Sequence, residues 1–198
     1  MGPPASDRCS DMIEVESKFQ VADTFELIQR ISSRWGARLT QSVEQRDEYF
    51  EHPSRSFDES DEALRIRRVV AGEQTSEIQL CYKGPRLDAE TKTRAEIECD
   101  LSLLSQNSDS SCREILLALG FRPVGVVHKR RQMYEFLEGN RAWTISFDEV
   151  SNLGNFVELE TLCEDDERLL ATTALKRLAE QMDLGSSIRT SYLEMLFA

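Results

Sequence analysis

The chain has 198 residues, with 36 acidic and 24 basic side chains and a formal net charge of −12 at pH 7. This length favours a single domain with enough apolar residues for a hydrophobic core. The negative charge argues against non-specific binding to nucleic acid, and no apolar run is long enough to cross a bilayer. The N-terminus lacks the apolar centre of a signal peptide, so we expect a cytoplasmic protein.

The chain begins with a segment that we expect to be a disordered tail, residues 1–11, and a single domain is expected over 12–198. Residues 12–20 alternate apolar and polar side chains, which is typical of a strand. A helix is then predicted from Asp23, which begins an Asp-x-x-Glu capping pattern, and Gly36 is expected to end it.

Strands are predicted to follow in the middle of the chain, near residues 42–51, 62–71, 75–83 and 92–100. Residues 52–61 are rich in Pro, Ser, Asp and Glu and are expected to form a loop. A second helix is predicted over 101–120, with Gly120 at its end.

The last third of the chain adds three predicted strands and two helices. The strands are expected near residues 122–138, 141–150 and 155–163. A long amphipathic helix is predicted over 164–184, and a short one over 189–198. Eight strands, largely linked by hairpins and flanked by helices, indicate an α+β fold in which an eight-stranded antiparallel β-barrel closes on itself.

Charged side chains recur at every second residue along six of these strands, in blocks that are mostly of one sign. The blocks are Glu14, Glu16 and Lys18; Arg65 and Arg67; Arg94, Glu96 and Glu98; Lys129 and Arg131; Asp148; and Glu158 and Glu160. Alternate residues of a strand share one face. Acidic blocks suit divalent cations and basic blocks suit phosphate groups. Such a pattern is also found on the solvent-exposed face of an ordinary antiparallel sheet. A barrel with the charges inside would instead enclose a polar tunnel.

The opposite faces of the same strands carry apolar residues. If the charges point inward, these residues should pack outside the tunnel against helices. We expect this of Ile13, Val15, Ile66, Ile97, Val157 and Leu159.

The ordered set of charged residues resembles the CYTH superfamily, the triphosphate tunnel metalloenzymes. The matching elements are Glu14-x-Glu16-x-Lys18, Arg65-x-Arg67, Lys83, Glu96-x-Glu98, Lys129-x-Arg131, Asp148 and Glu158-x-Glu160. Three further segments are similar to the class IV, CyaB-type adenylyl cyclase branch. They are Tyr-Lys-Gly-Pro at 82–85, the stretch 148–158 and the stretch 189–196.

The resemblance implies a role for each matching residue. Phosphate groups would be held by Lys18, Arg65, Arg67, Lys83, Lys129 and Arg131. Two divalent cations, Mg²⁺ or Mn²⁺, would be held by Glu14, Glu16, Asp148, Glu158 and Glu160. Glu96 and Glu98 would position a cation or orient the basic residues, and the catalytic set would be Lys18, Asp148 and Glu158. Whether Arg94 faces the tunnel is left open.

The resemblance also implies an enzyme that acts on a small-molecule triphosphate. The favoured activity is that of an adenylate cyclase, a lyase that converts ATP to cyclic AMP and pyrophosphate. The alternative is a triphosphatase that hydrolyses inorganic tripolyphosphate or an organic triphosphate, such as thiamine triphosphate or a nucleoside triphosphate. A non-catalytic polyphosphate or nucleotide sensor would need the basic rows but not two acidic pairs. The sequence does not decide the nucleoside preference, the physiological role or whether the protein forms a homodimer.

The thiols and imidazoles predict no further site. The five cysteines, Cys9, Cys81, Cys99, Cys112 and Cys163, have no Cys-x-x-Cys spacing and indicate reduced, incidental thiols. The two histidines, His52 and His128, stand alone, so a cation held by oxygen ligands fits better than zinc.

Overall fold

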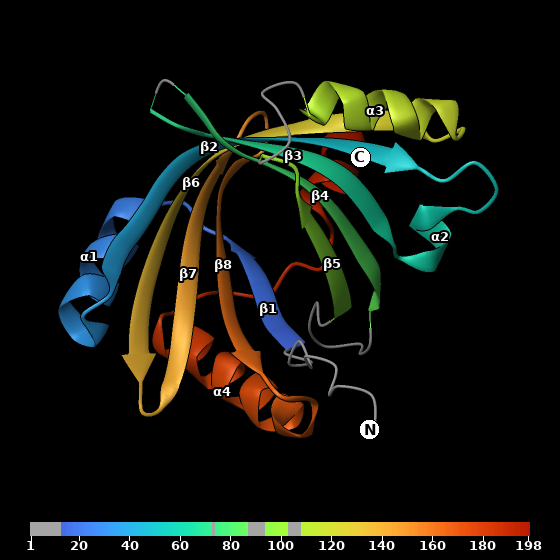
Figure 1. Cartoon of the computed structure of the whole chain (residues 1–198). Helices are drawn as coiled ribbons and strands as arrows, with labels where there is room; N and C mark the ends of the chain where they lie inside the picture. Colours follow the sequence, from blue (N-terminus) through green and yellow to red (C-terminus); the bar gives the residue numbers. More distant parts are fainter. Residues whose placement is uncertain (1–12, 73, 87–93, 103–107) are drawn as a thin grey trace, which may run out of the picture.

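The computed structural model describes residues 13–72, 74–86, 94–102 and 108–198 (Figure 1). The expected tail over 1–11 lies outside these ranges. Among the described residues, none of the helices combines the length and the apolar character that crossing a membrane requires.

The described part of the chain forms one antiparallel sheet of eight strands. These are β1 (Ile13–Gln20), β2 (Arg38–Glu51), β3 (Ala63–Ala71), β4 (Gln74–Arg86), β5 (Arg94–Asp100), β6 (Arg122–Glu138), β7 (Arg141–Val150) and β8 (Gly154–Cys163). The helices are α1 (Thr24–Trp35), α2 (Phe57–Ser60), α3 (Ser108–Ala118), α4 (Arg168–Gln181) and α5 (Tyr192–Phe197), with a 3₁₀ turn at Asp165–Glu167.

The sheet is strongly curled, and its two edge strands come back toward each other (Figure 1). The strand order is β1-β8-β7-β6-β2-β3-β4-β5, so β1 and β5 are the edges. Cα atoms of these two strands approach within 8 Å, although no backbone ladder joins them among the described residues. The predicted α+β fold with eight antiparallel strands around a tunnel is confirmed, and in the described residues the sheet forms a strongly curled half-barrel whose edges meet without a ladder.

Helix α1 shows how local sequence sets an element's ends. The Asp23 side chain accepts hydrogen bonds from the backbone N–H groups of Phe25 and Glu26, which lack partners within the helix. Gly36 ends the helix in the left-handed conformation, with φ of 66°. Both ends were predicted from the sequence.

The largest hydrophobic core lies between the convex face of the sheet and helices α1 and α4. The strands contribute Val15, Val157 and Leu159, all fully buried, against Ile31 of α1 and Leu175 of α4. Fully burying such a side chain stabilises the fold by about 1.5–3 kcal/mol. The outward residues of β1 and β8 therefore hold the tunnel wall against the helices, as predicted.

A second core lies under α3 and contains Ile66 of β3 and Leu116 of α3. The expectation for Ile97 was wrong, because its side chain is 66% exposed. It belongs to β5, the edge strand, and none of the helices in the described part makes extensive contact with that strand. Ile13 is half-buried and packs against the larger core.

Several predicted boundaries also differ from the structure. The predicted loop over 52–61 contains α2, which the Ser56 side chain caps and which anchors the buried ring of Phe57. Strand β4 continues through Gly84 and Pro85 to Arg86 instead of stopping before them. Helix α4 ends at Gln181, before Gly185.

Candidate functional site

A cavity of about 430 Å³ lies within the curled sheet, and the alternation of the strands fills its wall with charged side chains. The matched residues that line it are Glu14, Glu16, Lys18, Arg65, Arg67, Lys83, Glu96, Glu98, Lys129, Arg131, Glu158 and Glu160. Asp148, the remaining matched residue, is 1% exposed and is bonded to two of these lining residues. Strand β5 includes Arg94, but its side chain lies outside the described ones.

One half of the basic wall is organised around Asp47 of β2. The Nε and NH2 groups of Arg67 donate to the two carboxylate oxygens of Asp47, over 2.7 and 2.6 Å. The NH1 group of Arg65 lies 3.4 Å from the same carboxylate. Burial opposes the charge on Asp47, but Arg67 and Arg65 outweigh it and hold the pKa of this carboxyl well below its usual range.

Arg65 keeps unused hydrogen-bonding capacity. Its Nε is buried and has no hydrogen-bond partner among the described residues, while its NH1 lies at a long 3.4 Å from both the Tyr49 hydroxyl and the Asp47 carboxylate. A buried N–H without an acceptor costs about 1–3 kcal/mol. The Nε–H group of Arg65 is therefore available to donate a hydrogen bond to an anion in the cavity.

The other half of the basic wall is organised around Asp148 of β7. The Nε and NH2 groups of Arg131 donate to its two oxygens, each over 2.6 Å, and the Lys129 Nζ donates over 2.9 Å. The Tyr192 hydroxyl donates to Asp148 Oδ2 over 2.9 Å. Burial opposes the charge on Asp148, but Arg131 and Lys129 prevail and lower its pKa. Burial, with help from Arg131, lowers the pKa of Lys129 to about 8.

The acidic wall is formed by β1 and β8. The register places Glu16 opposite Glu160 and Lys18 opposite Glu158. Burial raises the pKa of Glu14 to about 8, with Lys83 opposing the shift and Glu16 adding to it.

Burial also raises the pKa of Glu160 to about 7, against the effect of Arg131 and with the support of Glu16. Carboxylates that are crowded and buried in this way fit a site for divalent cations, because a bound cation would offset their repulsion.

The C-terminal segment is built into the site. The Ile188 N–H donates to the Lys18 carbonyl over 2.7 Å, and the Lys18 ammonium donates to the Thr190 carbonyl. The same ammonium lies 4.1 Å from the centre of the Tyr192 ring, close enough for a cation–π contact. Lys18 is consequently 1% exposed, and this segment covers it at one side of the cavity.

Sequence reasoning missed two residues of the site, Asp47 and Tyr192. The sequence indicates Asp47 only weakly. It alternates with Gln45 and Tyr49 along β2, so the three side chains share one face of the strand, and all three line the cavity. Tyr192 had a weak signal in Ser191-x-x-Glu194, a capping box that starts α5 with Tyr192 as its first residue.

The arrangement can be compared with known proteins. The sequence profile of the CYTH domain matches residues 12–192. The chain belongs to the CYTH family. CYTH enzymes are metal-dependent and bind triphosphate substrates, which agrees with the charges of this cavity.

Individual CYTH relatives and similar structures support the assignment. The "Putative adenylate cyclase" of Methanocaldococcus jannaschii is 32% identical over 189 residues, which cover 93% of this chain and 98% of the relative. A solved structure of a Pyrococcus horikoshii protein is 36% identical, with a TM-score of 0.80 over 93% of this chain and 98% of that one.

A "Putative adenylyl cyclase" from Hippeastrum, described as revealing a dominant triphosphatase activity, is 15% identical with a TM-score of 0.60. That match covers 94% of this chain and 95% of that one. At this identity the likeness shows the fold alone.

Proposed function

We propose that this CYTH protein is an adenylate cyclase that converts ATP to 3′,5′-cyclic AMP and pyrophosphate with divalent cations. The observation that carries the proposal is the cavity itself, in which buried basic rows face two acidic pairs. The choice of reaction is supported by the 32% identical relative named as a putative adenylate cyclase.

The basic rows are proposed to hold the triphosphate. Arg65 has a free donor, while Arg67 and Arg131 present rigid guanidinium groups that suit phosphate oxygens. Lys18 of β1, Lys83 of β4 and Lys129 of β6 add point charges around the cavity. Asp47 pairs with Arg67 and Arg65, and Asp148 pairs with Lys129 and Arg131, which keeps the basic rows ordered when no substrate is present.

The acidic residues are proposed to hold two divalent cations, Mg²⁺ or Mn²⁺. The ligand set is Glu14, Glu16, Asp148, Glu158 and Glu160. Such a cation, when bound, neutralises phosphate charge and lowers the pKa of an attacking hydroxyl group. The protein contributes converging carboxyl groups and a partly enclosed cavity.

The catalytic set is proposed to act mainly by positioning. The ribose 3′-hydroxyl releases its proton to water, and its oxygen forms a bond to the α-phosphorus while the bond from that phosphorus to the bridging oxygen breaks, so that pyrophosphate leaves with the electron pair. Lys18, opposite Glu158 in the β1–β8 register, is placed to offset the growing negative charge. Asp148 orients Lys129 and Arg131.

A triphosphatase is the second candidate. It is favoured by the two complete acidic pairs on β1 and β8, which suit two-metal activation of a water molecule. The Hippeastrum protein shares the fold, has a cyclase name and is described with a dominant triphosphatase activity. Water would then attack the terminal phosphorus and release orthophosphate.

Product analysis separates the two reactions. The full chain is incubated with ATP or with inorganic tripolyphosphate, each with Mg²⁺ and with Mn²⁺. A cyclase yields cyclic AMP and pyrophosphate in equal amounts from ATP. Orthophosphate from tripolyphosphate, with no cyclic nucleotide under any condition, would assign the protein to the triphosphatases.

A further inference from the structure

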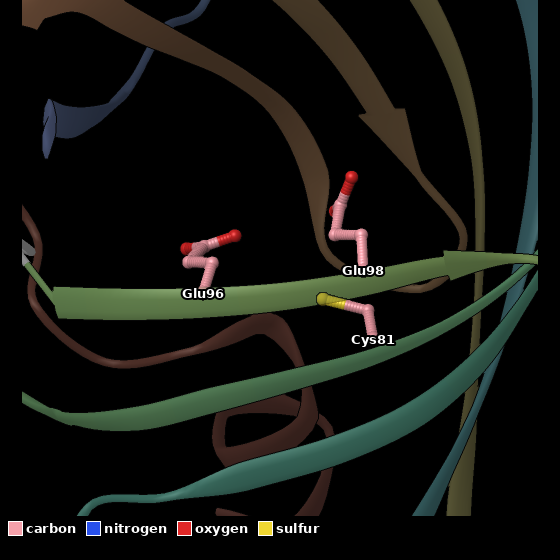
Figure 2. Close-up of side chains that lie close together, drawn as sticks. All are labelled: Cys81, Glu96 and Glu98. Atoms are coloured by element: carbon pink, nitrogen blue, oxygen red, sulfur yellow. The ribbon is translucent and has the colours of Figure 1, made fainter. Parts of the chain in front are cut away.

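Cys81 lies in the cavity wall beside two carboxylates. It belongs to β4, where its register partner is Glu98 of β5, and Glu96 stands two residues earlier on that strand. The Cys81 sulfur and one carboxylate oxygen from each glutamate all lie within 4.8 Å of one another. Figure 2 shows both carboxylates on the same side of β5 and the sulfur pointing toward that strand.

The three ligand atoms are close to the spacing that a tetrahedral cation needs. With metal–sulfur and metal–oxygen bonds of about 2.0–2.3 Å, ligand atoms stand roughly 3.3–3.8 Å apart. A contraction of about 1 Å is therefore enough. Rotation of the Glu98 side chain can bring its oxygen closer to the other two ligands, because Glu98 is exposed and makes no hydrogen bond or ion pair in the described part of the chain.

The thiol is also available as a ligand. Cys81 is 0% exposed, lines the cavity and has no hydrogen-bond partner within the described ranges. Burial raises the pKa of the Cys81 thiol, and Arg65 and Lys83 oppose this shift only in part, so a bound cation would have to displace the thiol proton. Lys83 pairs with one oxygen of Glu96, which leaves the other carboxylate oxygen for the cation. The buried sulfur, which has no hydrogen-bond partner and points toward two carboxylates, therefore adds a third ligand to the pair of glutamates.

The sulfur changes which ion the cluster selects. Mg²⁺ and Mn²⁺ prefer oxygen ligands, whereas a thiolate favours Zn²⁺ and Co²⁺. We propose that Cys81, Glu96 and Glu98 form an additional cation subsite in the cavity wall, which binds a thiophilic divalent ion such as Zn²⁺ or Co²⁺. Water completes the coordination. The inference does not depend on which triphosphate reaction the protein catalyses.

Cobalt binding tests this proposal directly. Co²⁺ is titrated into the reduced full chain with excess Mg²⁺, which occupies the sites made of oxygen ligands, and without any substrate. We expect a thiolate-to-cobalt charge-transfer band in the near ultraviolet that saturates at one equivalent. Zn²⁺ should displace Co²⁺ and remove the band.

Matched variants locate the ion. Cys81→Ser should abolish the band. Cys99→Ser is the matched control and should keep the band, because Cys99 is an exposed thiol of the same sheet that lies near Cys112 and is not part of the proposed site. Glu98→Gln should weaken Co²⁺ binding by about tenfold or more. Because Glu98 is exposed, this variant tests the site even if Cys81→Ser does not fold.

Three results would overturn the proposal. They are no band in the wild-type chain, a band that survives in folded Cys81→Ser, and a band that Cys99→Ser removes, which would place the ion at the outer cysteines. Since no substrate is present, these results are separate from any failure of the proposed activity.

Discussion

Glu16 and Glu160 stand directly opposite each other on the paired strands β1 and β8, with both side chains in the cavity. Like charges that face each other across a ladder destabilise it. Burial, opposed by Arg131 and supported by Glu16, raises the pKa of Glu160 to about 7. The protein therefore keeps an electrostatic repulsion at the place where we propose that cations bind.

Glu16→Gln should remove catalysis without weakening the fold. Turnover should fall by more than about 100-fold, because even residues that only orient a metal ligand contribute 10–100-fold. The melting temperature without metal should hold or rise, since one of two facing charges is gone. Steady-state kinetics and thermal unfolding measure both effects, and Glu44→Gln, an exposed glutamate of β2, is the control. Full activity in Glu16→Gln would exclude Glu16 from the site.

Arg65→Ala should weaken triphosphate binding by about 1.5–3 kcal/mol, the range for hydrogen bonds to charged groups. The reason is that its Nε has no acceptor among the described residues and faces a cavity suited to an anion. Calorimetric titration with tripolyphosphate measures the loss. Arg130→Ala is the control, because that side chain is 68% exposed and pairs with Glu149. Equal affinities for the two variants would contradict a phosphate role for Arg65.

The stability of the metal-free protein should fall as the pH rises from about 5 to 8. Burial raises the pKa of Glu14 from its ordinary 4.5 to about 8, so in this range the folded protein binds more protons than the unfolded chain. The free energy of unfolding must then decrease with pH. Lys129, whose pKa is lowered to about 8, has the opposite effect only above that pH.

Mg²⁺ should compensate for this loss. Because cations bind the ionised carboxylates, the rise in melting temperature with Mg²⁺ should be larger at about pH 8.5 than at about pH 6. Glu14→Gln should flatten both the pH dependence and the response to Mg²⁺. A Mg²⁺ effect that is independent of pH would show that Glu14 and Glu160 are not ligands.

Tyr192→Phe should lower kcat by about 10–100-fold, the range for a group that orients a functional carboxylate. The lost hydroxyl donates to Asp148, while the ring still packs on Phe156 and beside Lys18, so the fold should remain intact. The melting temperature should change little. Tyr134→Phe removes a hydroxyl from the core beside Phe147 and serves as the control. A kcat equal to that of the control would show that the Tyr192 hydroxyl does not matter.

The alternation of charge and apolar side chains predicted both the strands and their faces. Glu14, Glu16 and Lys18 face the cavity because Val15 and Phe19, one residue out of phase, enter the core under α4. The helix ends at Asp23 and Gly36 follow from local hydrogen bonds and backbone conformation, so sequence alone indicated them.

What the sequence could not show depends on partners that are distant in the chain. Tyr192 reaches Asp148 across 44 residues, and Asp47 meets Arg67 across 20. An isolated Tyr or Asp carries no sign of such a partner. The exposure of Ile97 likewise depends on where the sheet ends, since the same residue in a central strand would be covered.

No backbone ladder joins the edge strands β1 and β5 in the described residues, and both strands carry acidic side chains at this boundary. Glu14 and Glu96 lie close enough across it to repel each other when both are ionised. We expect that the wall can widen along this boundary without breaking any of the seven backbone ladders between the described strands. Ionised carboxylates on the two sides would favour widening, and cations bound between them would oppose it. On that expectation the width of the cavity depends on the ions it holds, so an ion bound at one edge strand would alter the space offered to a ligand on the opposite wall.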